Sequence, residues 1–250
     1  MNIDVLTLFP EMIEPVAAAS MLGRASKNGI LDIRAVNIRD FTQNKHKKTD
    51  DTPFGGGAGM VMSAQPVFDA LRSVDAQDKR ILYMSPRGRK LDRDLVTDLA
   101  AEENLVILCG HYEGIDERNI DFWKPEEISI GDYILTGGEL AAMVVVDAVA
   151  RMIPSVLGNQ ESHMEESVYS GLIEYPQYTK PAVWHGVAVP EIITNGNHAA
   201  IARWRREQSL KTTYEKRPEL LRTAPLTEKD KWYLRTIGWT DDPDDGSRTG

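Results

Sequence analysis

Short apolar runs alternate with helical patterns from the first residues to Pro154, and this alternation restricts the possible folds more than any other feature of the sequence. Apolar runs bounded by turn residues predict strands near 2–8, 31–37, 80–84, 104–109 and 127–135. Apolar residues at helical spacing predict helices near 64–73, 91–102 and 137–153. Strands that alternate with helices are typical of α/β domains with a mostly parallel sheet. We therefore expect such a domain at the start of the chain.

The texture of the sequence changes after Pro154. Residues 158–172 are polar and rich in turn formers, which is typical of a linker or loop. Beyond them, helices are predicted at 198–212, with Ile201, Trp204 and Leu210 as the buried stripe, and at 227–237, with Thr227 as N-cap. The expected division is an α/β domain over 1–157, a linker over 158–172 and a smaller helical domain over 173–250, whose acidic end we expect to fray.

Cysteine, histidine and charge usage exclude several classes of protein. The single Cys109 excludes an internal disulfide and fits a reducing cytoplasm, and the five scattered histidines show no metal-ligand spacing. The start of the chain carries acidic Asp4 where a signal peptide has basic charge. The most apolar helical run, 140–150, is short and contains Asp147, so no membrane span is expected. A cytoplasmic protein is predicted.

The net charge of −9 argues against a protein that coats nucleic acid by bulk electrostatics. Basic residues nevertheless gather at 45–48, 87–90 and 203–222. Each group alone is more typical of a solvated face, but three such groups in an acidic protein favour local contacts with nucleic acid.

Three of the predicted strands run directly into glycine-bearing loops. The loops begin at Ser85, Gly110 and Ser129, and the last of them includes a further predicted strand at 133–135 and leads into a long apolar helix at Glu139. Ligands of α/β proteins bind beyond the carboxyl ends of the strands, and the amides at a helix start are unpaired. The three loops together therefore predict one pocket for a nucleotide-like cofactor.

A fourth glycine-rich segment, "DDTPFGGGAGMVM" (50–62), matches no familiar phosphate loop. No Lys-Ser/Thr pair follows its glycines, and Met60 stands where the dinucleotide fingerprint needs glycine. Its glycines could approach a base or a phosphate, or the segment could be an ordinary surface loop. The sequence also lacks a Gly-x-Ser-x-Gly elbow, which lowers the odds of a hydrolase. A cofactor site with separate basic patches fits a transferase that acts on nucleic acid.

The motifs "LFPEM", "DDTPFGGGAGMVM", "SPRGRKL", "CGHYEGIDER", "SIGDYILTGGELAAM", "ARMIPSVLGN", "EYPQYTKP" and "KRPELL" stand in this order along the chain. Together they resemble the bacterial tRNA (guanine-N1)-methyltransferases of the TrmD type, which belong to the SPOUT class. The resemblance extends from Met1 to about Trp239.

The resemblance implies a trefoil-knotted α/β domain, a helical C-terminal domain and a homodimer with active sites at the subunit interface. It also implies S-adenosylmethionine as methyl donor, dependence on Mg²⁺, and methylation of N1 of the guanosine immediately 3′ of the anticodon, at position 37 of the tRNA. That modification supports maintenance of the reading frame. Neither a membrane nor DNA is expected as a partner.

The resemblance also assigns roles to residues of this chain. It places Glu113 near the Mg²⁺ ion, and Arg151 where an arginine stabilises charge on the guanine O6, although a cation at a helix C-terminus is also a common structural feature. For tRNA contacts it implies Asp50, Pro53 and Gly55 in the glycine-rich loop, with Arg203 and Arg206 in the C-terminal helices. The donor would be held by Ser85, Pro86, Gly110, Tyr112, Glu113, Gly114, Ser129, Ile130, Gly131, Asp132, Tyr133, Ile134, Leu135, Gly137 and Gly138.

One position departs from the family's pattern. The family's general base is usually an Asp followed by Ser-Phe, whereas this chain has Glu166 followed by Ser167 and Val168. A carboxylate must accept the N1 proton as the methyl arrives, and glutamate keeps this chemistry with one more methylene. Glu166 is therefore the predicted base, with Glu165 and Glu161 as alternatives, while periodicity alone favours a polar linker with solvated glutamates.

Two other functions remain compatible with parts of the sequence. A glutamate in place of the family's aspartate general base, together with the net negative charge, would suit a non-enzymatic RNA-binding module that has kept the fold. A dinucleotide-dependent oxidoreductase would explain a cofactor pocket, but the absence of Gly-x-Gly-x-x-Gly counts against it.

Overall fold

The computed structural model of the protein describes residues 1–156 and 171–240. Contacts between residues divide the chain into two compact units, Met1–Gln160 and Glu161–Gly250. Each unit has its own hydrophobic core, and each is described separately here.

The sheet of the first unit has five strands in the order β2-β1-β6-β5-β7, and every neighbouring pair is parallel. This arrangement confirms the mostly parallel sheet predicted from the sequence. Because all five strands run the same way, the loops that follow them lie at one edge of the sheet. The strands are β1 (Asn2–Thr7), β2 (Asp32–Asn37), β5 (Arg80–Lys90), β6 (Asn104–Cys109) and β7 (Glu126–Ser129).

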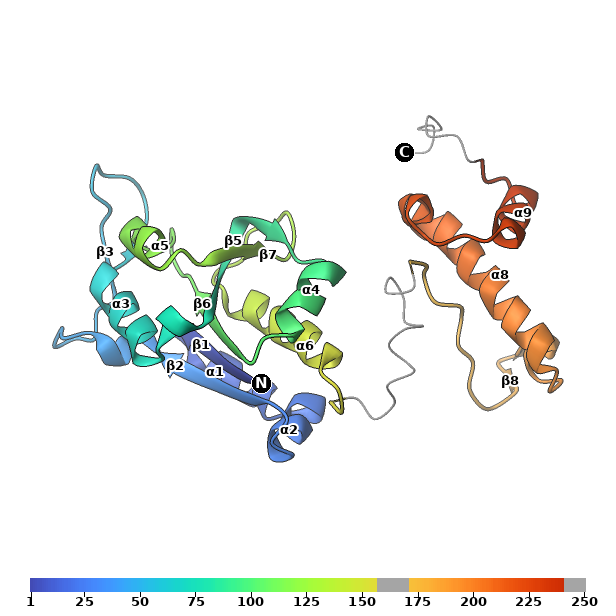
Figure 1. The fold of residues 1–250 in the computed structure, drawn as a ribbon, viewed down its shortest axis with the longest axis horizontal. Helices are drawn as coiled ribbons and strands as arrows, with labels where there is room; N and C mark the ends of the chain where they lie inside the picture. Colours follow the sequence, from blue (N-terminus) through green and yellow to red (C-terminus); the bar gives the residue numbers. More distant parts are fainter. Residues whose placement is uncertain (157–170, 241–250) are drawn as a thin grey trace. The chain divides into compact units, whose positions relative to one another are not determined.

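Helices cover both faces of this sheet (Figure 1). Successive side chains of a strand point to opposite faces, so Leu105 and Ile107 pack with α1, α2, α4 and α6, while Val106 and Leu108 pack with α3 and part of α5. The helices are α1 (Pro10–Ala17), α2 (Ser20–Lys27), α3 (Ala64–Ser73), α4 (Arg93–Ala100), α5 (Glu117–Trp123) and α6 (Glu139–Met152).

The sequence prediction was wrong for the end of the last strand. We expected a strand over 127–135 with a short strand at 133–135, but β7 ends at Ser129 and the chain then forms a loop up to α6. The apolar residues Tyr133, Ile134 and Leu135 are exposed and have no neighbouring strand to bond. Apolar β-formers therefore mimic a strand here, although they belong to a loop.

Smaller elements complete the first unit. A short hairpin of β3 (Asp50–Asp51) and β4 (Val61–Met62) is antiparallel and carries the glycine-rich segment between its strands. Two 3₁₀ helices, η1 (Ile38–Phe41) and η2 (Ala76–Asp78), connect larger elements. In the described part of the chain, no helix has the length and apolar character needed to cross a membrane.

Within residues 171–240, the α-helices of the second unit are α8 (His198–Lys216) and α9 (Glu228–Thr236). Leu172, Leu210, Leu221 and Leu234 form its core. Thr227 caps α9 through a capping box with Asp230, which confirms the predicted N-cap. Of the predicted stripe of α8, Leu210 is buried, whereas Ile201 and Trp204 are only partly buried. The remaining elements are β8 (Val183–Trp184), β9 (Val187–Ala188), η3 (Glu191–Ile193) and η4 (Pro218–Arg222).

Candidate functional site

A pocket of about 410 Å³ opens at the carboxyl ends of β5, β6 and β7. Residues 85–87 within β5 and residues of the loops after β6 and β7 line it, so the three segments predicted to form one pocket do lie together. Of the residues expected to hold the donor, all except Asp132 are among its lining residues. Asp132 instead accepts a hydrogen bond from Lys90 Nζ at 2.5 Å, and both of these side chains are largely exposed.

The prediction of a strand that ends near residue 84 was wrong, because β5 continues to Lys90 and the segment 85–88 is an irregularity within its pairing with β7. Ile128 of β7 pairs with Met84 before this segment and with Arg89 after it, so β5 continues along the same neighbour beyond the segment. Gly88 is needed for this close return, because a Cβ there would lie 2.3 Å from the Glu127 carbonyl carbon. Ser85 and Pro86 are thereby fixed at the pocket.

The loop after β6 wraps over a buried tyrosine. Tyr83 lies beneath Gly110, where a Cβ would come within 2.9 Å of the phenolic oxygen. Burial, followed by the negative charge of Glu127, raises the pKa of Tyr83 above its usual value. Tyr112 has a φ of +57° and Gly114 a φ of +121°, so this turn uses backbone conformations that few residues adopt. The tight turn exposes the Tyr112 ring to the pocket.

The loop after β7 is joined to the loop after β6 through backbone contacts. The Gly138 N–H donates to the Gly110 carbonyl at 2.9 Å, and His111 and Gly137 form an isolated antiparallel bridge. No side chain fits at Gly138, because a Cβ would lie 2.8 Å from Cys109 Cα. Two of the loops expected to hold the donor are therefore bonded directly to each other.

A buried carboxylate lies directly behind this junction. Glu139, the first residue of α6, is 2% exposed, and its Oε1 accepts a hydrogen bond from Thr7 Oγ1 at 2.7 Å. His111 Nε2 lies 3.4 Å from Glu139 Oε2. The neighbouring Cys109 is fully buried, and burial together with the charge of Glu139 raises its pKa well above the usual value.

Several lining residues were not predicted from the sequence. Arg87 is exposed, as expected from the sequence, but it also lines the pocket and contacts Glu127 and Glu117. The basic run 87–90 does not indicate these contacts, because the two glutamates are remote from it in sequence. Residues of β5 were missed because an apolar strand predicts core, although the end of a strand also forms the floor of the site. The lining residues outside the prediction are Tyr83, Met84, Arg87, His111, Ile115, Glu117, Ile120, Ile128, Thr136 and Ala141.

The β3–β4 hairpin is attached to the rim of this pocket. The Glu113 N–H donates to the Met60 carbonyl at 3.0 Å, and the Met62 N–H donates to the Gly114 carbonyl at 2.9 Å. Gly59 lies against the Glu113 side chain, whose Oε1 would be 2.4 Å from a Cβ at that glycine. The loop expected to contact the anticodon is thus bonded to the loop expected to hold the donor.

At the tip of this hairpin, Phe54 is fully exposed at 101% of its reference area. The Gly56 N–H donates to the Pro53 carbonyl at 3.3 Å, and Gly55 has a φ of +87°. These features are typical of a type II turn with Phe54 at its first corner position. Sequence reasoning named Asp50, Pro53 and Gly55 in this hairpin and missed the aromatic ring between them.

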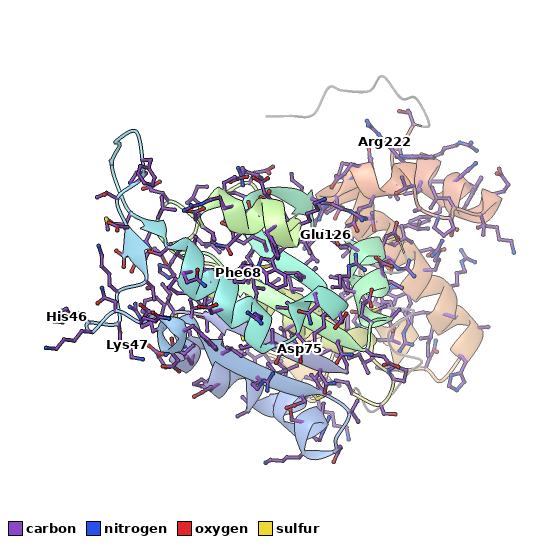
Figure 2. All side chains as sticks on the ribbon, turned by 60° about the vertical axis from the view of Figure 1, so that its left-hand side comes forward. His46, Lys47, Phe68, Asp75, Glu126 and Arg222 are labelled. Atoms are coloured by element: carbon purple, nitrogen blue, oxygen red, sulfur yellow. The ribbon has the colours of Figure 1, made fainter. Side chains whose placement is uncertain are left out.

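A basic loop precedes the hairpin. His46 and Lys47 project outward from the segment between η1 and β3, as Figure 2 shows. Lys47 lies 4.0 Å from Asp40 and Lys48 lies 3.4 Å from Asp51, in pairs that are exposed and therefore weak.

Residues expected to act on the acceptor base are placed only in part. Arg151 lies in the last turn of α6 and is partly buried. Glu166 and its alternatives Glu165 and Glu161 lie outside the described residues. Their proximity to Arg151 therefore stays a prediction.

The two arginines expected to bind tRNA differ in their surroundings. Arg203 is exposed and pairs with Glu207 one turn further along α8, at 2.8 Å. Arg206 instead donates to both carboxylate oxygens of Asp230, at 3.1 and 2.9 Å. Arg206 therefore joins α8 to α9, and Arg203 is the more accessible cation of the two.

The described residues do not form a metal centre. Among residues 1–156 and 171–240, no three His, Cys, Asp or Glu side chains lie together as ligands of an ion. Glu113 and Glu117 line the pocket, but two carboxylates alone do not make a dedicated magnesium cage. A metal role for Glu113 stays a prediction from the resemblance.

Known proteins of one family are similar to this chain along most of its length. The sequence model of the family described as tRNA (guanine-1)-methyltransferase TrmD matches residues 1–223. A protein of Alkaliphilus oremlandii named tRNA (guanine-N(1)-)-methyltransferase is 53% identical over 245 residues, covering 95% of this chain and 98% of its own length. Proteins with the same name from Clostridium acetobutylicum and Geobacillus kaustophilus are 52% and 51% identical, with 94% of this chain covered in each case and 96% and 97% of theirs. The chain belongs to the tRNA (guanine-1)-methyltransferase family.

Proposed function

We propose that this protein transfers a methyl group from S-adenosylmethionine to N1 of the guanosine that follows the anticodon in tRNA, and so supports reading-frame maintenance. The observation that carries the proposal is the three-loop pocket at the carboxyl ends of β5, β6 and β7, with a glycine-rich hairpin bonded to its rim. Such a reaction fits the cytoplasmic location expected from the sequence.

The lining residues suit the methyl donor, which the family implies. The pocket volume lies within the range for small-molecule sites. Ile128 and Leu135 offer apolar surface for a flat adenine ring, while Glu113 and Glu117 offer carboxylates for the positive sulfonium and ammonium groups. When bound, S-adenosylmethionine supplies an electrophilic methyl group on a positively charged sulfur.

The acceptor needs a base, because N1 of guanine carries a proton at neutral pH. In the proposed step the Glu166 carboxylate takes that proton, the N1 lone pair forms the bond to the methyl carbon, and the electrons of the carbon–sulfur bond return to sulfur. Negative charge develops on the guanine O6 as N1 loses its proton, and the Arg151 guanidinium stabilises it until the methyl transfer neutralises the base. The sequence supports both assignments: Arg151 stands in a matching motif, and Glu166 is a carboxylate at the position where the family usually has an aspartate.

Magnesium has no assigned place in this step. Glu113 is the residue that the resemblance links to the ion, and the described part of the chain adds no further ligands to it. A Mg²⁺ requirement is tested by running the assay below with Mg²⁺ and again with a chelator.

We further infer a homodimer, supported by an exposed apolar stripe on two adjacent helices. Met12 and Val16 on α1 and Leu140 and Val144 on α6 are 41–57% exposed. Each pair is spaced by four residues and so lies on one helix face, and α1 contacts α6. A second copy of the chain is the proposed occupant, and it would bring its own acceptor-binding residues to the pocket.

We also infer that the chain is threaded as the family's trefoil knot. The proposal is supported by the loop after β7, which turns back and bonds beneath the loop after β6, at Gly138 and Gly110.

The test is methyl transfer from labelled S-adenosylmethionine to tRNA transcripts that carry guanosine or adenosine immediately 3′ of the anticodon. We expect label on the guanosine transcript only. Glu166→Gln and Arg151→Ala are each expected to lower kcat by about a hundredfold, with Arg151→Lys as the conservative control. Unchanged rates would remove the assigned roles, and a wild-type protein that binds RNA without transferring methyl would be the non-enzymatic module.

A further inference from the structure

The pair formed by His111 and Glu139 has no role in the chemistry above, yet it occupies the junction of two donor loops. Glu139 is almost completely buried, and a buried carboxylate is costly unless it is paired and hydrogen-bonded. Its position at the start of α6 supplies a favourable helix dipole. The side-chain partners are Thr7 at 2.7 Å on one oxygen and His111 at 3.4 Å on the other.

Each of these three residues belongs to a different segment of the fold. Thr7 ends β1, His111 follows β6, and Glu139 begins α6 after the loop from β7. Thr7 Oγ1 also accepts the Phe9 N–H at 2.9 Å, which fixes the start of the next segment. Glu139 is therefore the point at which the three segments are joined by side chains.

The packing leaves His111 little freedom. Its ring centroid is 4.8 Å from that of Phe9 and 5.5 Å from that of Tyr112. The pair also lies directly over Gly137, where a Cβ would be 2.3 Å from His111 Nε2 and 2.4 Å from Glu139 Oε2. Gly137 is thus required for the pair to form, in addition to its backbone bridge with His111.

From this geometry we propose that Glu139, through His111 and Thr7, is a positioning residue that holds the loops 110–114 and 130–138 at the separation which the methyl donor needs. Glu139 itself does not line the pocket, whereas His111, Gly137 and Gly138 do. The pair therefore acts on the donor through the loops, and a pocket whose loops are fixed beforehand loses less freedom on binding. The proposal rests on the function proposed above.

The test measures donor binding directly, by calorimetry with S-adenosylmethionine and no tRNA. We expect His111→Ala and Glu139→Gln each to weaken donor binding roughly tenfold, and the double variant to be no weaker than the worse single variant, because the two residues act through one contact. His111→Gln should restore most of the affinity, since its amide group can donate a hydrogen bond to Glu139 from the same position.

Three further measurements separate positioning from loss of fold. Circular dichroism and thermal melting show that each variant is folded, and hydrogen exchange at Gly110–Tyr112 and Gly137–Gly138 should become faster only in the weakened variants. In turnover, the KM for the donor should rise while the KM for tRNA stays unchanged. Lys90→Ala is the control and should leave donor affinity unchanged. It removes only an exposed ion pair with Asp132 in the loop after β7.

The outcomes distinguish this proposal from the proposed function. If the wild type fails to bind S-adenosylmethionine, the function itself is wrong. If the wild type binds and folded His111→Ala and Glu139→Gln proteins bind equally well, the positioning role is wrong. If the fold-loss of donor affinity in the double variant equals the product of the two single fold-losses, His111 and Glu139 act independently. The proposal that they act as one pair is then wrong.

Discussion

At the scale of single residues, Gly59 brings the glycine-rich hairpin against Glu113 in the pocket that we propose holds the donor. It has a φ of +89°, and a Cβ there would lie 2.4 Å from Glu113 Oε1. Gly59→Ala is expected to displace the Glu113 side chain and weaken donor binding several-fold, in addition to straining the backbone by about 1 kcal/mol. Calorimetry with S-adenosylmethionine measures the effect.

The hairpin supplies its own matched control for this substitution. Gly56 has a similar φ of +79°, but nothing lies within 4 Å of a Cβ at that position. Gly56→Ala should therefore strain the turn without changing donor affinity. Equal donor affinities for the two alanine variants would show that contact with Glu113 has no effect on the pocket.

Substitution of Phe54 is expected to affect activity and not stability, because its side chain contributes nothing to the folded core. Its ring is fully exposed at a turn in the loop expected to contact the anticodon. Stacking of a base on an aromatic ring contributes about 1–3 kcal/mol, so Phe54→Ala should lower kcat/KM for tRNA by roughly fivefold to a hundredfold with the melting temperature unchanged. Phe54→Tyr should retain activity.

Phe122→Ala is the comparison for Phe54→Ala. Phe122 is also exposed, at 65%, but its ring contacts Phe68 and Trp123 with centroids 5.1 and 5.2 Å away. Its removal should cost stability and leave tRNA turnover unchanged. If Phe54→Ala turns over tRNA as fast as wild type, the exposed ring does not stack on RNA.

Residue contacts across the fold are also the part of the site that the sequence could not predict. Most of the pocket-lining residues in the three glycine-bearing segments were named from the sequence, because glycines after apolar runs are visible in a linear pattern. The bonding of His111 to Glu139 was not predicted, because 28 positions separate them and neither spacing nor composition brings them together. Thr7 is further still from both, and only the parallel sheet places it beside them.

At the scale of elements, the length of a helix or strand and its packing decide whether it can be predicted from the sequence. β6 is an almost continuous apolar run and β1 is mostly apolar apart from Asp4, and both were predicted within about one residue. The helices α1 and α2 were missed, since each has eight residues and contains Pro15 or Gly23, which disfavour helix on propensity alone. Packing on the sheet stabilises them, and that contribution has no local signal.

The cap of α9 gives a prediction about pH. Asp230 is buried, which by itself raises its pKa, but the hydrogen bonds from Arg206 and Thr227 outweigh burial and lower the pKa below its usual value. A carboxylate with a lowered pKa adds stability at pH above its unfolded value, and that stability is lost as pH falls through the folded value. The second unit should therefore lose stability below about pH 4.

Asp230→Asn isolates this contribution. We expect the substitution to destabilise the second unit by about 1–2 kcal/mol at pH 7, since the capping box and the bond to a partly exposed Arg206 are both weakened. Chemical unfolding followed by fluorescence of Trp239 and its neighbours measures the difference between wild type and variant. The difference should shrink as the pH is lowered below about 4, and a difference that is constant with pH would contradict the assignment.

At the scale of the whole molecule, the exposed stripe on α1 and α6 connects assembly to activity. Val144 is 46% exposed on this stripe, so Val144→Glu should place a charge in the proposed subunit interface. We expect sedimentation to show monomers and the methyl transfer rate to fall by more than about tenfold.

Val187→Glu serves as the control for this experiment. Val187 is 70% exposed in β9 of the second unit, away from both helices of the stripe in sequence. It should leave the mass and the rate unchanged. A Val144→Glu protein with the same mass as wild type would show that another surface forms the assembly, or that the protein is a monomer.

β5 pairs with β7 both before and after residues 85–88, and this pairing affects where a protease can cleave the chain. The run Arg87–Lys90 has the side chains that trypsin recognises, yet Arg89 and Lys90 pair with β7 and Leu91 donates to Ser129 at 2.8 Å. The run Lys45–Lys48 has the same chemistry in an exposed loop with only weak ion pairs. A protease cleaves segments that open locally, so brief digestion should cut the first unit within 45–48 and spare 87–90. Basic residues beside the pocket are thereby protected from proteolysis by the same strand pairing that shapes it.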